Sequence, residues 1–481
     1  MTPMASTERT ESAVVEQPAP ERPDARAWLV VLVACAGQFL VVLDVSVVNV
    51  ALPSMRADLG LSAAGLQWVV NAYSIAFAGF MLLGGRAADL FGRKRTFLVG
   101  LGLFTAASLA GGLAQQEWHL LAARAVQGLG AAVLAPATLT ILTSAVPEGA
   151  ARARAIGTWS AVGAGGGAAG GLVGGVLTDA LSWRWVLLIN VPIGALVLAG
   201  AAVWLVESHA RDARRLDLPG ALLVTAGLAT LAYGIVQTEA EGWGAAATLV
   251  PLVAGLLLLG LFVAVEARTK APLMPLAFFR IRAVSAANAA MFVNGSAMFA
   301  MWFFMTLYAQ NVLGYTPLGA GLALIPSSLS VVIGAKLAPR LMARAGARQV
   351  AIAGTLLAAV GMAWQSTMGA DGSYATAILG PGILMMVGGG LAATPLASLA
   401  TSAGAPGDAG LLSGLINTSR TMGGALGLAV LSTIAASRTG GALTPEALTA
   451  GYALAFRASA GALLVGVVLM LIWLPRRKKA A

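Results

Sequence analysis

A single carboxylate in an apolar stretch is the first candidate for chemistry. Asp44 stands in the run VVLDVSVVNVALP, residues 41–53, in which no other side chain is charged. An acid in a helix that spans a membrane costs roughly 2.5–3.5 kcal/mol to insert, so such a residue is a functional candidate by default. The sequence predicts that Asp44 carries a proton. The alternative is that it only hydrogen-bonds a neighbouring helix.

The overall composition is that of a membrane protein. Of the 481 residues, 58% are hydrophobic and only 10% are charged, whereas a soluble protein carries about 25% charged residues. The 59 glycines suit helices that pack closely in lipid. Nucleic acid is not an expected partner, because the basic residues behind the net charge of +10 form no patch with interleaved aromatic side chains.

No metal and no other cofactor is expected from the residue types. Cys35 is the single cysteine, which excludes an internal disulfide and a cysteine-based metal site. The two histidines, His119 and His209, stand near the ends of predicted helices and form no cluster. Because the chain also lacks a nucleophile–base pair and a nucleotide-binding motif, it is not expected to be an enzyme.

The hydrophobic pattern predicts an all-α polytopic membrane protein. Fourteen segments are each long enough to cross a hydrocarbon core of about 30 Å. The polar N-terminal residues do not have the form of a signal peptide, and the first apolar segment is a full span. The fourteen predicted segments are 28–50, 66–84, 97–114, 119–143, 155–177, 185–206, 217–237, 246–265, 284–310, 318–337, 349–368, 376–400, 412–436 and 453–474.

Lysine and arginine are distributed unevenly between the predicted loops. If the N-terminus is cytoplasmic, 24 of the 30 basic residues fall on the cytoplasmic side, four fall on the outer side, and Arg124 and Arg420 lie inside spans. Cytoplasmic loops carry the excess of positive charge in membrane proteins. We therefore expect a protein of the cell membrane with both termini in the cytoplasm, and the net charge is mostly a consequence of topology.

Two short echoes indicate an internal duplication. The loop GGRAADLFGRKR, residues 84–95, is echoed by PRLMARAGARQ, residues 339–349, and GLGAAVLAP before Pro136 is echoed by GGGLAATP before Pro395. Both echoes relate the first six spans to the last six in the same orientation, and a site between repeated halves is typical of transporters. The predicted divisions are a disordered tail at 1–27, a six-helix half at 28–206, two inserted helices at 207–283, a second six-helix half at 284–474 and a basic tail at 475–481.

These motifs resemble the major facilitator superfamily, and specifically its fourteen-span drug:proton antiporters. The segment RAVQGLG, residues 124–130, resembles the fourth-span motif, while LDVSVVNVALP and SWRWVLLINVPIG resemble first- and sixth-span signatures. The resemblance implies a major facilitator fold and a cytoplasmic latch that holds the outward-facing state. The latch residues that match the loop motif are Gly85, Asp89, Gly92, Arg93 and Lys94.

The fifth span resembles the antiporter motif of the same family. That motif usually contains Gly-Pro-x-x-Gly-Gly, and here the residues are GGLVGG, 170–175, so that Gly171 stands where proline is usual. The run is not a phosphate-binding loop, because it lies in a predicted span and lacks the Gly-Lys-Ser/Thr ending. We expect its small-residue face, with Gly163, Gly170, Gly174 and Gly175, to slide against a neighbour during alternating access.

Asp44 and Arg124 are predicted at nearly the same depth. At 1.5 Å per residue, Asp44 lies roughly 24 Å and Arg124 roughly 22 Å from the inner boundary of a ~30 Å core. A charge-linked pair is therefore plausible. Burial raises the pKa of a carboxyl group and a nearby arginine lowers it, so a substrate or a moved arginine can switch its protonation.

The sequence predicts a proton-coupled exporter. One proton that crosses ~100 mV contributes about 2.3 kcal/mol, and one pH unit adds about 1.4 kcal/mol. The expected substrate is a small amphiphile, neutral or monocationic, because the last six spans contain no acid in their interiors. The alternatives are a carrier of one metabolite, siderophore or lipid, and a non-transporting membrane sensor or assembly factor. A monomer is expected.

The expected substrate pocket consists of polar and aromatic residues at mid-membrane depth. Methionine and aromatic side chains suit an apolar site of broad specificity. Arg420 is the charge well inside the second half, where it counters an acid, binds an anionic group or hydrogen-bonds carbonyl groups. The pocket candidates are Trp68, Asn71, Tyr73, Asn294, Met298, Trp302, Asn417 and Arg420.

Overall fold

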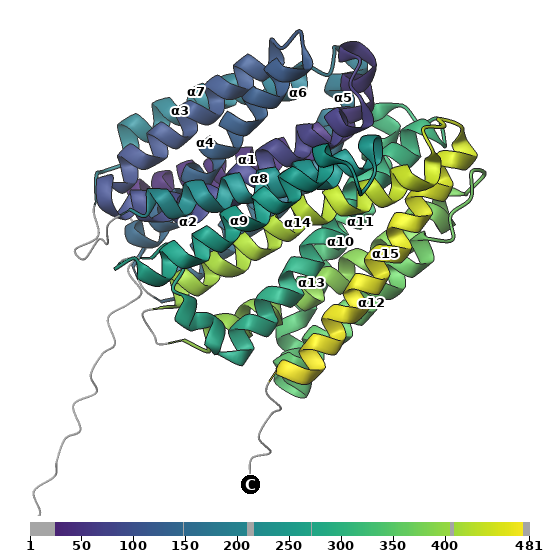
Figure 1. Cartoon of the computed structure of the whole chain (residues 1–481). Coiled ribbons are helices and arrows are strands. Elements are labelled where there is room, and N and C mark those ends of the chain that lie inside the picture. The colour runs from purple at the N-terminus through teal and green to yellow at the C-terminus, as the bar shows by residue number, and fades with distance from the viewer. Residues whose placement is uncertain (1–24, 148, 209–215, 271, 405–407, 475–481) are drawn as a thin grey trace, which may run out of the picture.

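The computed structural model describes residues 25–147, 149–208, 216–270, 272–404 and 408–474, and all their regular structure is helical (Figure 1). The helices are α1 (Ala25–Leu59), α2 (Ala63–Phe91), α3 (Arg93–Gly112), α4 (Glu117–Ala145), α5 (Ala150–Ala180), α6 (Trp185–Leu188), α7 (Asn190–Trp204), α8 (Leu218–Glu241), α9 (Ala246–Arg268), η1 (Leu276–Arg280), α10 (Arg282–Asn311), α11 (Pro317–Ala345), α12 (Ala347–Gln365), η2 (Tyr374–Leu379), α13 (Gly380–Thr401), α14 (Ala409–Thr439) and α15 (Pro445–Trp473).

Each of the fourteen predicted segments coincides with helix. The sixth corresponds to α6 and α7, which together form one candidate span, and the twelfth to η2, a π-helical turn, continued by α13. Thirteen of the described helices are long and apolar enough to cross a membrane. The exception is α14, whose centre carries the polar run Asn417–Thr421. It nevertheless packs against α2, α8, α10 and α15 within the bundle.

Local sequence explains where several helices begin. The side chains of Ser62, Thr316 and Thr444 each accept a hydrogen bond from a backbone N–H in the first turn of α2, α11 and α15. This is the usual N-cap arrangement, and proline in the first turn of α11 and α15 costs no helical hydrogen bond. These turns fix the helix starts at the same end of the bundle.

A glycine separates two helices at equivalent points of the two halves. Gly92 stands between α2 and α3 with φ of 102°, and Gly346 stands between α11 and α12 with φ of 89°. Side chains with a Cβ rarely adopt such φ values, so each tight turn depends on glycine. The two loops with echoed sequences therefore share one form, although the duplication itself stays a prediction.

The helices form two groups that meet along three seams. Helices α1 to α7 pack together, and α10 to α15 pack together (Figure 1). The groups meet where α5 crosses α11, where α2 lies along α14 and where α1 approaches α10. Helices α8 and α9 pack on one another, and α8 lies against both α2 and α14. The pair thus covers one of the seams between the halves.

One hydrophobic cluster joins the halves and defines an end of the molecule. This cluster, here called the distal core, includes Val47 and Met55 of α1, Phe304 of α10, Leu431 of α14 and Tyr452 of α15. Because α1 ends and α15 begins in it, α1 begins and α15 ends at the opposite end, here called the terminal end. The start of α1 and the end of α15 therefore lie on the same side.

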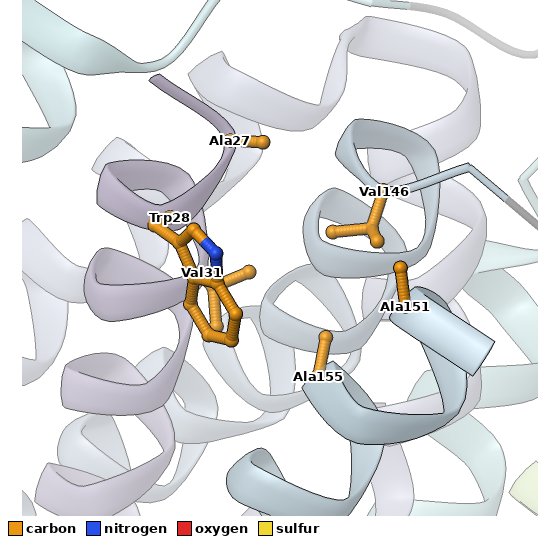
Figure 2. A pocket seen from close by; sticks show the side chains of 6 residues that line it. All are labelled: Ala27, Trp28, Val31, Val146, Ala151 and Ala155. Carbon is orange, nitrogen blue, oxygen red and sulfur yellow. The ribbon is translucent and has the colours of Figure 1, made fainter. Parts of the chain in front are cut away.

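At the terminal end each half has a core of its own. One cluster contains Cys35, Leu142 and Ala155 from α1, α4 and α5. A separate cluster contains Met291 and Met470 with side chains of α13 and α14. Figure 2 shows the first of these regions, where Trp28, Val31 and Val146 are among six side chains that line a small apolar hollow between α1, α4 and α5. The halves are thus held together mainly at the distal end.

Candidate functional site

Asp44 lies at the centre of a buried hydrogen-bond network. Its Oδ2 accepts from Nη1 of Arg124 at 2.7 Å, and its Oδ1 accepts from Nε2 of Gln127 at 2.7 Å and from Nδ2 of Asn190 at 2.9 Å. Ser108 Oγ accepts from the same two amide groups, at 2.5 Å from Gln127 and 3.1 Å from Asn190. The five side chains come from α1, α3, α4 and α7, so the network ties together four helices of one half.

Arg124 makes three further contacts besides its ion pair with Asp44. Its Nη1 also donates to Oε1 of Gln127 at 2.7 Å, and its Nε donates to the carbonyl oxygen of Val69 at 3.1 Å. Its guanidinium carbon lies 4.4 Å from the centre of the Tyr73 ring, a cation–π distance. Removal of one partner from a buried ion pair of this kind destabilises the folded protein by about 3–5 kcal/mol, because the other charge is left buried and unpaired.

The network is sealed from solvent. Asp44 and Asn190 have no exposed surface, and Arg124 and Gln127 are nearly as buried. A proton therefore reaches Asp44 only when the surrounding helices move. The chemistry that this arrangement permits is reversible protonation of a carboxylate whose charged form is held by three donors, with a conformational change required for access.

Sequence reasoning found two members of this network and missed three. Asp44 and Arg124 were expected at the same depth, and the structure brings them into contact. Ser108, Gln127 and Asn190 were not singled out, although Gln127 lies in the quoted RAVQGLG motif and Asn190 in SWRWVLLINVPIG. The available signal was an uncharged polar residue inside an apolar span and inside a motif.

The predicted pocket residues have different surroundings, and the pocket itself stays a prediction. Tyr73 is buried between Arg124 and Phe77, and Asn71 is fully buried with neither side-chain polar atom hydrogen-bonded to described residues. Trp68 packs beside Tyr233 of α8, with ring centres 6.5 Å apart. In the other half Asn294 is buried, Met298 and Trp302 lie against the distal core, and Asn417 and Arg420 are exposed.

The loop motif at the junction of α2 and α3 is held by contacts that differ in part from the expected latch. Asp89, in the last turn of α2, pairs with Arg93, the first residue of α3, at 4.0 Å. The backbone N–H groups of Lys94 and Arg95 donate to the carboxylate of Glu207, which follows α7, at 3.1 and 3.2 Å. Glu207 thus satisfies free N–H groups at the start of α3. Its role was not apparent in the sequence because it lies far along the chain.

Arg86 of the loop motif, near the end of α2, connects the motif to the stretch that follows the inserted pair of helices. Its guanidinium donates to the carbonyl oxygen of Pro272 and, at 3.5 Å, to that of Leu273. Both residues belong to the stretch between α9 and η1. Gly85, the remaining glycine of the motif, lies next to Pro136 of α4. The loop motif therefore contacts both the first half and the stretch that follows the inserted helices.

The glycines of α5 allow two helices to approach it from different sides. A Cβ on Gly170 or Gly174 would meet Ser46 or Val47 of α1, and Gly163 lies near Gln38 of the same helix. Gly171 and Gly175 face α11, where a Cβ on Gly321 would collide with the carbonyl oxygen of Gly171. Gly171, at the position where the motif usually has proline, therefore permits close contact between the halves.

Polar contacts close the distal end beside this crossing. Asp179 Oδ2, at the end of α5, accepts from the backbone N–H of Leu318 in the first turn of α11 at 3.0 Å. Gln310 Nε2 of α10 donates to the carbonyl oxygen of Val50 at 2.8 Å. Both bonds link one half to the other, so the structure represents a state that is closed at the distal end.

No cluster of three or more histidine, cysteine, aspartate or glutamate side chains that could hold a metal ion occurs in the described part of the chain. Asp44 has no second acid beside it in its network, and its oxygens are used by protein donors.

Comparison with known proteins identifies the family. The model of the Major Facilitator Superfamily matches residues 34–428. The chain is 50% identical over 434 residues to the cephamycin export protein of Amycolatopsis lactamdurans, covering 89% of each chain. It is 38% identical over 490 residues to the puromycin resistance protein of Streptomyces alboniger, covering 99% of this chain and 97% of the relative.

Solved structures share the fold. The POT family transporter PepTSo superposes with a TM-score of 0.71 at 15% identity, covering 94% of this chain and 98% of that one. A bacterial homologue of the human lysosomal transporter Spinster, in an inward-facing conformation, superposes with a TM-score of 0.66 at 16% identity and covers 95% and 100% of the two chains. This multi-pass membrane protein therefore belongs to the major facilitator superfamily, a family of transporters and not of enzymes.

Proposed function

We propose that this protein is a proton-coupled antiporter that exports hydrophobic drugs or natural products across the cell membrane by alternating access. The observation that carries the proposal is the sealed network around Asp44, in a chain whose relatives at 38% to 50% identity are named for antibiotic export or resistance. The unequal distribution of basic residues supports cytoplasmic termini, so the terminal end faces the cytoplasm.

Protonation of Asp44 would change the network in a defined way. The charged carboxylate accepts from Arg124, Gln127 and Asn190 at once. A protonated carboxyl group holds these donors less strongly, because hydrogen bonds to a charged acceptor are about twice as strong as neutral ones. The interaction between Arg124 and the carboxyl group is then weaker, and the helices that the network joins can move relative to one another.

The change can reach the interface between the halves through α1 and α5. Ser46, two residues from Asp44, donates to the carbonyl oxygen of Gly167 in α5 at 2.7 Å. The opposite face of α5 meets α11 of the other half. A shift of α1 that follows protonation therefore displaces the helix that holds the distal end closed. We infer that deprotonated Asp44 accompanies substrate binding from the cytoplasm and that a proton from outside promotes release.

The alternative of a carrier for one metabolite, siderophore or lipid differs in the breadth of substrates. An exporter of drugs transports several unrelated amphiphiles, whereas a specific carrier transports one compound and its close analogues. A non-transporting sensor would produce no substrate-linked proton flux at all. Uptake assays with three chemically unrelated amphiphiles separate these functions.

Replacing Asp44 tests the proposal directly. In inside-out vesicles we expect the Asp44→Asn variant to insert normally and to lose at least nine-tenths of the proton-driven uptake of a fluorescent amphiphile. The matched control is Asp58→Asn, the same change on the same helix, where the partners Arg184 and Trp183 lie at the distal rim. We expect this control to keep most of the uptake. Undiminished coupled uptake by Asp44→Asn would overturn the assignment.

A further inference from the structure

One face of α14 changes character halfway along the helix. Leu428, Leu431 and Ala435 project from this face into the distal core, which also contains Val47 of α1. Residues spaced by three, four or seven positions share a face of an α-helix. The same face therefore continues toward the terminal end through Arg420, Asn417 and Ser413, and these three side chains are exposed. The side chains of α14 that pack against α2 and α8 lie on a different face, which includes Met422, Ala425 and Ala429.

Arg420 is exposed and yet deep in the protein. Its side chain is accessible to solvent, and it lies away from the ends of α14, a helix that packs against α2, α8, α10 and α15 within the bundle. It is eleven residues from the start of α14 at Ala409, which places it about 16 Å along the helix axis. The guanidinium therefore stands at mid-membrane depth, just below the point where the distal core closes the interface.

The two arginines inside the predicted spans differ in their hydrogen-bond partners. Arg124 has a carboxylate, an amide oxygen, a carbonyl oxygen and an aromatic ring as partners. In the described part of the chain, the side chain of Arg420 has neither a hydrogen bond nor an ion pair, and the last six spans contain no acid in their interiors. A guanidinium carries five donors and is always charged. A charged group at this depth in a membrane protein normally pairs with another group and marks a functional site.

The acids on helices that pack against α14 are too distant or already engaged. Asp89 of α2 and Asp408 before α14 lie at the terminal end, and Asp408 is about 18 Å along the axis from Arg420. Glu446 of α15 and Glu241 of α8 lie at the distal ends of their helices. Asp44 is buried and uses both oxygens for donors of its own half. Because no acid in the described part of the chain is available to Arg420, we look for its anion outside the protein.

We propose that Arg420, with Asn417 on the same face, forms an anion-binding subsite for the exported molecule, so that the preferred cargo is an amphiphile with one carboxylate. The inference rests on the proposed function and replaces the neutral or monocationic cargo expected from the sequence with an anionic one. The planar guanidinium binds a carboxylate through two parallel hydrogen bonds. One turn further along, Gly424 lets the Phe299 ring approach the helix, which provides an apolar surface for the body of the amphiphile.

A matched pair of probes tests the subsite. Pyrenebutyrate and its neutral amide differ only in the charged group, and their binding to the full chain in phosphatidylcholine vesicles can be measured by fluorescence. We expect the parent to bind the carboxylate at least tenfold more tightly than the amide. The Arg420→Gln variant should lose this preference and still bind the amide within twofold of the parent, and Arg420→Lys should retain part of it.

A control arginine lies on the same helix. Arg438 is in the last turn of α14 at the distal end, and Arg438→Gln should leave the binding of both probes unchanged. Equal binding of the two probes by the parent would overturn the inference, and so would an equal loss of both in Arg420→Gln, which indicates a structural role. If added phosphatidylglycerol displaces pyrenebutyrate and the protein does not transport pyrenebutyrate, the subsite binds a lipid headgroup. That result would overturn the inference that the cargo is an anionic amphiphile.

The inference and the proposed function can fail separately. If Arg420→Gln still couples amide uptake to the proton gradient while the parent shows no preference for the carboxylate, only the inference fails. If the parent moves neither probe in response to a proton gradient but binds the carboxylate through Arg420, only the exporter function fails. Transport of both probes with a strong preference for the carboxylate supports both.

Discussion

Asp44 depends on uncharged neighbours that hold its charged form. Asn190 begins α7, the last helix of the first half, and donates to Asp44 at 2.9 Å. Loss of a hydrogen bond to a charged group costs about 1.5–3 kcal/mol. We expect Asn190→Ala to lower the thermal stability of the protein and to reduce the coupling between proton and substrate fluxes several-fold. Both are measurable on purified protein by thermal unfolding and in vesicles by paired flux assays.

Asn49 supplies the control for this prediction. It is also a buried asparagine, but it donates only to the carbonyl oxygen of Val45 in its own helix, at 2.8 Å. Asn49→Ala should leave coupling intact and change stability less than Asn190→Ala does. Equal effects of the two substitutions would mean that Asn190 contributes packing alone.

At the residue scale the charged members of the site were predictable and the neutral ones were not. A lone Asp or Arg in a span has a large cost, so its presence is informative, and helical rise alone placed Asp44 and Arg124 at one level. Uncharged polar residues cost much less in a span: Gln127 and Asn190 were marked only by their place in the quoted motifs, and nothing in the chain distinguishes Ser108 from a packing residue. The orientation of Trp68 toward Tyr233 depends on the position of α8, which no local pattern determines.

At the scale of elements, the crossing of α5 and α11 controls the closed distal end. A methyl group on Gly321 would collide with the backbone of Gly171, so Gly321→Ala should disfavour this state and open the distal end more often. In a Cys35→Ser background, a cysteine at Thr178 should react several-fold faster with an impermeant maleimide from outside. The control is Gly165→Ala on α5, because nothing lies within 4 Å of a Cβ there. Unchanged labelling in Gly321→Ala would contradict this role.

The helices were largely predictable because hydrophobic length is a strong signal in a chain of this composition. Their ends were less so: α1 continues to Leu59, and α14 lacks the hydropathy of a span although it lies in the bundle. Polar residues such as Asn417 and Arg420 lower its hydropathy because the face that carries them is not directed at lipid. A departure from the span pattern thus marks the helix that carries the proposed anion subsite.

At the scale of the whole molecule, the charge of the cargo determines how strongly the membrane potential drives export. If one proton enters for each molecule that leaves, a neutral cargo moves one charge and a monoanion moves two. Each charge that crosses 100 mV contributes about 2.3 kcal/mol, and about 1.4 kcal/mol is a tenfold change in a gradient. In vesicles clamped with potassium and valinomycin, about 60 mV should raise the gradient of pyrenebutyramide about tenfold and that of pyrenebutyrate about a hundredfold. An equal dependence for the two compounds would show that the carboxylate crosses with an additional positive charge, which would rule out one-for-one exchange.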